Sequence, residues 1–220
     1  MKSDFYWNED YPFKKDKKYL IFFRGTMAPP SRGHFEAVLK YLNVPNVKVL
    51  VYHLATESRH GVPSETSRKI WKIYAKNALT REQRRNLIFQ KGHDLESFSK
   101  ITKGFDYIVY LKGNEQRDLI GDVQTNGKVD KKLVKRRRSY ENKQVKKRKK
   151  FSTIAHENGA RHFDFIFIDR TTHSSLSATA FVKAIKRREH MDDLAFFMPD
   201  TLPGSKAKKV VRMLKKYSLH

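Results

Sequence analysis

The chain has 220 residues, of which 39% are hydrophobic and 12% aromatic, a composition that suits one sizeable core and excludes a disordered protein. It carries 47 Lys and Arg against 23 Asp and Glu, a formal charge of +24, and it has no cysteine. The missing cysteines exclude a disulfide framework and a thiolate metal site. No apolar run approaches the roughly 20 residues that span a bilayer, and the polar N-terminal segment is no secretory signal. We therefore expect a cytoplasmic or nucleic-acid-associated protein (a virion included), not a secreted one.

Apolar runs alternate with amphipathic segments along the chain. Short apolar or aromatic runs predict strands at 19–24, 47–54, 86–90, 105–113 and 163–170. Helical periodicity predicts helices at 34–42, from Ser64 as N-cap to Leu79, from Asp94 to about 102, at 177–189 and at 205–218. Strands that alternate with helices indicate an α/β fold, here a Rossmann-like three-layer sandwich with a mostly parallel, five-stranded sheet.

We expect one α/β domain over residues 19–220, preceded by an N-terminal extension, 1–18. The domain includes a basic insertion at 128–150, between the fourth and fifth strands, and C-terminal helices at 191–218. In such sheets, ligands bind beyond the carboxyl ends of the strands. Three polar segments follow predicted strands and should share that rim: 25–34, 112–113 and 170–177.

The segment GTMAPPSRGH, residues 25–34, joins the first strand to the first helix. Gly25 permits a tight turn and lets backbone N–H groups approach an anion, while two adjacent prolines stiffen the chain. His34, at the helix N-terminus, can donate a ring N–H to a phosphate, and the Ser31 hydroxyl adds a second donor. The segment is thus a candidate phosphate cradle without the G-x-x-x-x-G-K-[ST] pattern of a P-loop. The alternative is an ordinary turn whose histidine caps the helix.

Three segments resemble signatures of the nucleotidylyltransferase superfamily. The turn resembles Gly-Thr/Ser-Phe/Met-Asp/Asn-Pro-x-His/Thr-x-Gly-His, in the form found in cytidylyltransferase-like enzymes, in phosphopantetheine and nicotinamide mononucleotide adenylyltransferases, and in small phage- and virus-encoded members. LSATAFV, 176–182, resembles the second signature, Ile-Ser-Ser/Ala/Gly-Thr-x-x-Arg. YLKGNEQRD resembles the Gly-x-Asp segment that closes the family's fourth strand, and MDDLAFFMPDTLP resembles the helix and turn that often follow the second signature.

The resemblance implies transfer of an adenylyl or cytidylyl group from ATP or CTP, usually with Mg²⁺, to a phosphate-bearing acceptor, with release of pyrophosphate. Such catalysis rests on positioning and charge stabilisation, so no protein nucleophile is needed. The residues implied in nucleotide binding are Gly25, Thr26, Met27, Gly33, Lys112, Gly113, Glu115, Ser177 and Thr179. Those implied in catalysis are Ser31, His34, Lys183 and Lys186. For Ser177 and Thr179, capping of their own helix is the plainer alternative, and the histidine spacing predicts no metal site of the protein's own.

Three positions depart from the family pattern. Ala28 stands where Asp or Asn is usual, Glu115 where Asp is usual, and Val182 where the second signature has the arginine that neutralises the departing pyrophosphate. Losing such a donor costs about 10²–10³ in rate unless another cation substitutes. Lys186 is one helical turn from Val182, and Lys183 lies about 100° around the helix. These two lysines are therefore the candidate substitutes.

The segment 131–150, KKLVKRRRSYENKQVKKRKK, holds 12 basic residues and one acidic residue, Glu141. A charge excess of this size predicts a polyanionic partner, DNA or RNA, bound through its phosphates without sequence reading. The residues implied are Lys131, Lys132, Lys135, Arg136, Arg137, Arg138, Lys146, Lys147, Arg148, Lys149 and Lys150. A second hypothesis is therefore a nucleic-acid-associated protein, such as a virion structural protein, that kept the fold after its catalysis decayed.

Overall fold

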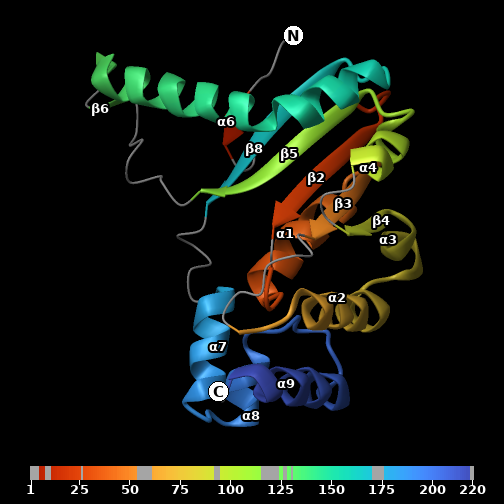
Figure 1. Cartoon of the computed structure of the whole chain (residues 1–220), viewed down its shortest axis with the longest axis vertical. Coiled ribbons are helices and arrows are strands. Elements are labelled where there is room, and N and C mark those ends of the chain that lie inside the picture. The colour runs from red at the N-terminus through yellow and green to blue at the C-terminus, as the bar shows by residue number, and fades with distance from the viewer. Residues whose placement is uncertain are drawn as a thin grey trace. The chain divides into compact units, whose positions relative to one another are not determined.

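The computed structural model describes residues 5–7, 11–25, 27–53, 61–91, 95–114, 124–125, 128–129, 131–169 and 176–218 (Figure 1). Contacts within the chain divide it into two compact units. The first unit holds Met1–Tyr19 and Leu95–Arg170, and the second holds Leu20–Asp94 and Thr171–His220.

The first unit is built on three parallel strands in the order β1-β8-β5. Its elements are β1 (Phe5–Trp7), α4 (Leu95–Thr102), β5 (Tyr107–Asn114), β6 (Gln124–Thr125), β7 (Lys128–Val129), α6 (Lys131–Glu157) and β8 (His162–Asp169). β5 and β8 pair from Tyr107 opposite His162 to Asn114 opposite Asp169. Both strands are buried over most of their length, which explains their near-continuous apolar sequences.

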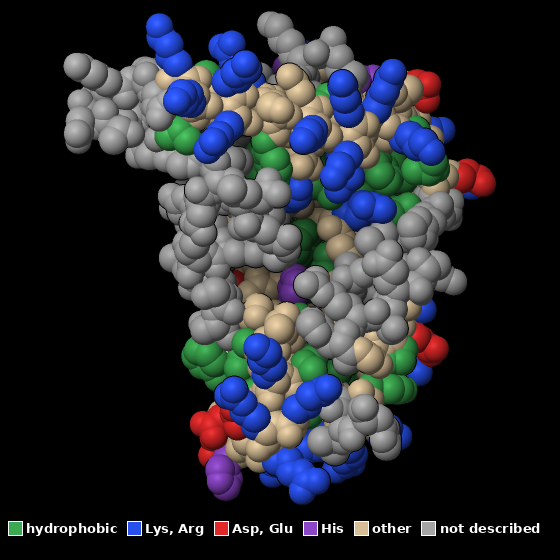
Figure 2. All heavy atoms as spheres, turned by 60° about the vertical axis from the view of Figure 1, so that its left-hand side comes forward, with side chains coloured by type: hydrophobic (Ala, Val, Ile, Leu, Met, Phe, Trp, Pro, Cys, Tyr) green, Lys and Arg blue, Asp and Glu red, His purple; other side chains and the backbone are tan. Residues whose placement is uncertain are grey.

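Helix α6 is the crossover between β5 and β8, and it packs on β8 and on α4 (Figure 1). The basic run therefore lies where the sequence predicts it, between the fourth and fifth predicted strands, and forms the N-terminal part of one continuous 27-residue helix. Figure 2 shows Lys and Arg side chains gathered along this helix. The charge run is ordered structure with a packed inner side.

The second unit contains β2, β3 and β4 in that order, with β3 and β4 parallel from Val49 opposite Leu87 to His53 opposite Lys91. Its elements are β2 (Tyr19–Gly25), α1 (Arg32–Leu42), β3 (Val47–His53), α2 (Ser64–Ala78), α3 (Arg81–Arg85), β4 (Leu87–Lys91), α7 (Ala178–Lys186), α8 (Met191–Ala195) and α9 (Gly204–Ser218). Helix α1 packs on β3, and α9 packs on α2, α7 and α8. The core includes Trp71 and Tyr74 of α2, 1% and 0% exposed.

The predicted α/β class is confirmed: the five predicted strands are β2, β3, β4, β5 and β8, and the described pairings among them are parallel. One helix boundary is wrong. Ser64 is the first residue of α2, and Pro63 is its N-cap, because the Pro63 carbonyl already accepts the Ser67 N–H at 3.1 Å. Asp94, predicted to open α4, lies outside the described residues.

Candidate functional site

The turn between β2 and α1 is buried in the second unit. Met27 has a left-handed backbone conformation with φ 42°, which is uncommon for any residue other than glycine. Its side chain is buried. Gly25 does not take such a backbone, and a Cβ placed on it would lie 3.4 Å from Met27 Cε and 3.5 Å from Met27 Cγ. The left-handed residue of the turn is thus Met27, and a Cβ at Gly25 would make only ordinary contact with the methionine side chain. Backbone strain of this kind is concentrated at functional sites. Thr26 lies outside the described residues.

Tyr74 holds the turn in place from α2. Its hydroxyl donates a hydrogen bond to the Pro30 carbonyl at 3.2 Å, and its ring meets Phe35 of α1 edge to face, with the centroids 6.0 Å apart. Burial raises the pKa of Tyr74, so the hydroxyl remains a protonated donor. Tyr74 therefore contacts both the loop between β2 and α1, at Pro30, and the first turn of helix α1, at Phe35.

Ser31 and His34 form a local pair at the start of α1. Ser31 is the N-cap, His34 is the third helical residue, and the Ser31 backbone N–H donates to His34 Nδ1 at 3.2 Å. The Ser31 Oγ lies 2.9 Å from the same nitrogen. Since a backbone amide can only donate, Nδ1 is an acceptor, and the neutral imidazole carries its proton at Nε2. His34 therefore caps its own helix, which is the alternative reading of this histidine in the sequence. The same hydrogen bond favours the imidazole tautomer that carries its proton at Nε2.

Exposure separates the two residues. Ser31 is 0% exposed, whereas His34 is half-buried and its ring lies beside Phe23 of β2, with the centroids 6.3 Å apart. Gly33 is the second residue of α1 and is half-buried as well. The Ser31 hydroxyl is directed at His34, so within this structure it orients the imidazole.

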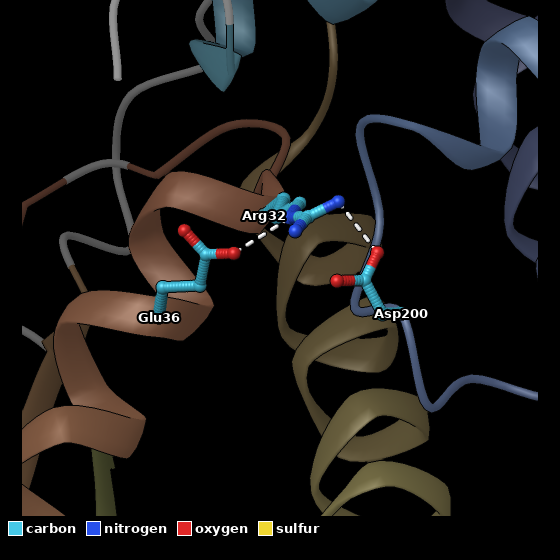
Figure 3. Close-up of polar contacts among 3 residues, drawn as sticks. All are labelled: Arg32, Glu36 and Asp200. Carbon is cyan, nitrogen blue, oxygen red and sulfur yellow. Dashed lines mark hydrogen bonds and ion pairs between the residues drawn. The ribbon is translucent and has the colours of Figure 1, made fainter. Parts of the chain in front are cut away.

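Arg32 ties this helix terminus to the segment that follows α8 (Figure 3). Its Nε donates to Glu36 Oε1 at 2.6 Å, and its Nη1 donates to Asp200 Oδ1. Its backbone N–H donates to the Phe197 carbonyl at 2.7 Å. The hydrogen bond with Glu36, and then the charge of Asp200, raise the pKa of Arg32. Two carboxylates and a carbonyl thus fix the first residue of α1.

The Arg32 side chain is partly exposed, so the ion pair with Asp200 should stabilise the fold only modestly. We expect Asp200→Ala to lower the free energy of unfolding by at most about 1 kcal/mol, and by less in high salt. Urea unfolding measures this, with Asp193→Ala on α8, another exposed aspartate, as the matched control. A loss above about 2 kcal/mol, or one that salt leaves unchanged, would show that the ion pair contributes more than a surface pair does.

The N-terminus of α7 carries the second signature. Ser177 is its N-cap, and the Ser177 Oγ accepts the Ala180 N–H at 3.2 Å, so the predicted capping alternative is present here too. Ser177 and Thr179 are both half-buried, and the first turn contains no acidic side chain. The partial positive charge of the helix N-terminus is therefore not offset within that turn.

Phe197 connects the two signature segments. Its carbonyl accepts the Arg32 N–H of α1, and its ring stacks on Phe181 of α7, with the centroids 5.2 Å apart and the planes at 11°. Within the second unit, α1 and α7 therefore both contact Phe197, although the two helices are more than 130 residues apart in sequence.

The candidate cations of α7 lie on its exposed side. Lys183 and Lys186 are exposed, whereas Val182, at the position of the signature arginine, is 4% exposed. At 1.5 Å per residue, Lys183 lies about 9 Å and Lys186 about 13 Å along the axis from Ser177. Lys183 is thus the nearer of the two to the helix N-terminus.

Lys112 and Gly113 belong to the first unit, at the carboxyl end of β5. Lys112 Nζ donates to the Tyr140 hydroxyl of α6 at 2.9 Å and lies 5.1 Å from the centroid of that ring. Glu115 lies outside the described residues. The structure therefore brings the turn and the α7 terminus into one unit, while nucleotide contacts by Lys112 and Gly113 stay a prediction.

Sequence reasoning missed Arg32, Phe197 and Asp200. The spacing of Arg32 and Glu36, four residues apart on one helix, is a readable signal. Phe197 and Asp200 lie in the segment MDDLAFFMPDTLP, which the sequence marks as resembling a family element, but nothing in it indicates that these two residues contact α1.

Within the described ranges, no group of three or more His, Asp or Glu side chains is placed to hold a metal ion. In the same residues, no helix combines the length and hydropathy that a membrane crossing requires.

A comparison with protein-family models found no match, and neither did one with curated proteins. Two solved structures of Plasmodium falciparum nicotinic acid mononucleotide adenylyltransferase, complexed with APC and with NaAD, resemble this chain with TM-scores of 0.52 and 0.54. Each is 12% identical to it, and the matches cover 92% of this chain and 96% and 97% of those chains. Likeness at this identity concerns the fold. The chain thus shares the α/β fold of these two adenylyltransferase structures, which is the fold class that its sequence predicts.

Proposed function

We propose that the protein is a nucleotidylyltransferase, which transfers an adenylyl or cytidylyl group from a nucleoside triphosphate to a phosphate-bearing acceptor. The observation that carries this proposal is the link through Phe197. Its carbonyl accepts the N–H of Arg32, the first residue of the helix bearing His34, and its ring stacks on Phe181 in the first turn of the helix capped by Ser177. Two helix N-termini with hydroxyl and imidazole donors suit a polyphosphate.

In the proposed reaction, an oxygen of the acceptor phosphate attacks the α-phosphorus in line. The bond from that phosphorus to the bridging oxygen breaks, and pyrophosphate leaves with the electron pair. His34 Nε2–H would donate to a phosphate oxygen whose charge grows in the transition state, and Ser31 would position His34. No proton needs to leave an ionised acceptor phosphate, so no general base is required.

The N-terminus of α7 would hold the β- and γ-phosphates. While the Ser177 Oγ accepts the Ala180 N–H, its own O–H can still donate, and Thr179 supplies a second hydroxyl. Mg²⁺ would arrive as part of the substrate, because it keeps several waters and binds mainly through substrate phosphates in such sites.

The test is acceptor-dependent release of pyrophosphate by the full chain. We expect release from MgATP or MgCTP with at least one acceptor among nicotinic acid mononucleotide, nicotinamide mononucleotide and phosphopantetheine, and none without an acceptor. The first acceptor is included because the structural neighbours are named for it. His34→Ala, purified identically, controls for a contaminating enzyme.

The same experiment separates the alternative, a fold that binds but no longer catalyses. If nucleotide binds and no acceptor gives turnover that depends on His34, the transferase proposal fails and the decayed fold is favoured. If no nucleotide binds either, the candidate cradle itself is refuted.

A further inference from the structure

Helix α6 presents a long cationic face (Figure 2). Its exposed Lys and Arg residues are Lys131, Lys132, Lys135, Arg136, Arg138, Lys143, Lys146, Lys147, Lys149 and Lys150. The one acidic residue in this stretch, Glu141, is half-buried. Like charges three and four residues apart destabilise an isolated helix, so packing elsewhere must stabilise this one.

That packing is on the inner side of the helix. Phe151 meets Phe98 of α4 with the centroids 4.9 Å apart, and Tyr140 meets Phe167 of β8 at 5.8 Å. The guanidinium of Arg148 lies 4.7 Å from the centroid of Tyr110 on β5. These contacts fix the helix from Tyr140 to Phe151, and the exposed Lys and Arg side chains project from the opposite side of the same rigid helix.

The outer residues follow one stripe. Lys135, Arg138, Asn142, Lys146 and Lys149 are spaced by three or four residues, so they share a face about 21 Å long. The part of the stripe from Lys135 to Lys146 borders a shallow hollow of about 440 Å³, which Ser139 and Lys143 also line. The stripe thus combines point charges with neutral hydrogen-bonding groups.

The aromatic and apolar side chains of α6 indicate which kind of polyanion this face can bind. Single-stranded nucleic acids bind on exposed aromatic rings, and the two rings of this helix, Tyr140 and Phe151, face the strands and α4. Interfacial membrane helices need an outward apolar face, whereas here the apolar side is packed inward. What remains is attraction to closely spaced phosphates on a rigid polyanion.

We propose that α6 binds double-stranded nucleic acid through its phosphate backbone, without reading sequence. This binding is independent of the nucleotidyl transfer proposed above, because it uses no residue of the candidate cradle or of the α7 terminus. A duplex supplies one negative charge per about 1.7 Å of its axis, so several phosphates lie within reach of the stripe.

The test uses the full chain and a labelled 20-base-pair duplex of random sequence, as DNA and as RNA, between 50 and 200 mM salt. Changing Lys135, Arg138, Lys146 and Lys149 to Gln should weaken duplex binding at least about tenfold and flatten the slope of log affinity against log salt by about three to four. All four side chains are exposed, so the fold should survive, and circular dichroism checks this.

The matched control changes Lys206, Lys208, Lys209 and Lys216 of α9, four exposed lysines, to Gln. This control lowers the net charge by the same four units as the α6 variant. It should leave most of the duplex affinity, and most of the slope of log affinity against log salt, unchanged. Equal losses in both variants would overturn the assignment to α6. Tighter binding to a single strand than to the duplex, or an equal loss of binding to phosphatidylserine vesicles, would also overturn it.

Discussion

Replacing His34 with alanine is expected to lower kcat/KM for nucleotidyl transfer by about 10²–10³ and to leave the fold intact. The imidazole is half-buried at the third position of α1, and its Nδ1 is occupied by the Ser31 N–H, so its proton sits at Nε2. A donor fixed in this way needs no reorganisation when phosphate charge develops. The loss should therefore fall mainly on kcat, measured by steady-state pyrophosphate release.

Variants of neighbouring residues separate this role from a general disturbance of the helix. Ser31→Ala should lower kcat by about tenfold, because the ring loses the hydroxyl that orients it, and Ser31→Thr should restore most of the activity. Lys40→Ala, exposed in the last turn of α1, should have no effect. A full kcat in His34→Ala would remove the imidazole from the proposed mechanism.

The turn could be predicted because its information is local. Ser31, His34 and the residues between them are contiguous, and a serine N-cap with a hydrogen-bonding side chain at the third helical residue is a readable helix start. What closes the site is not local: Phe197 and Asp200 meet Arg32 across more than 160 residues. No periodicity or spacing in the sequence encodes such a contact.

The same contrast holds in the first unit. β5 and β8 are long apolar runs, a pattern that predicts strands, whereas β1 has only three residues and pairs with β8. Tyr11, in the predicted N-terminal extension, donates to the buried Asp164 carboxylate at 2.7 Å, a partner 153 residues away. In α6 the charge run obscured the inward stripe, because Tyr140, Gln144, Arg148 and Phe151 mix apolar and polar side chains.

Val182 raises the question of which cation meets the departing pyrophosphate. The position is 4% exposed, so an arginine there would bring a guanidinium into the core and would need a buried partner. The valine is consistent with the packing of α7, in which Phe181 and Ile185 are also fully buried. Within α7, a substitute cation can therefore come only from the exposed side of the helix, where Lys183 and Lys186 lie.

Lys183 is the better placed substitute, and we expect Lys183→Ala to lower kcat/KM by about 10²-fold, the effect of losing one charged donor. Helical side chains lean toward the N-terminus, which brings the Lys183 ammonium toward Ser177 across the roughly 9 Å of axis between them. Lys186→Ala is the matched control: it removes the same charge one turn further away and should change kcat/KM by less than about threefold. Lys183→Arg should retain activity, since it keeps the cation. Equal effects of the two alanine variants would show that α7 supplies only a diffuse field, and no effect of either would move the search for the cation to another element.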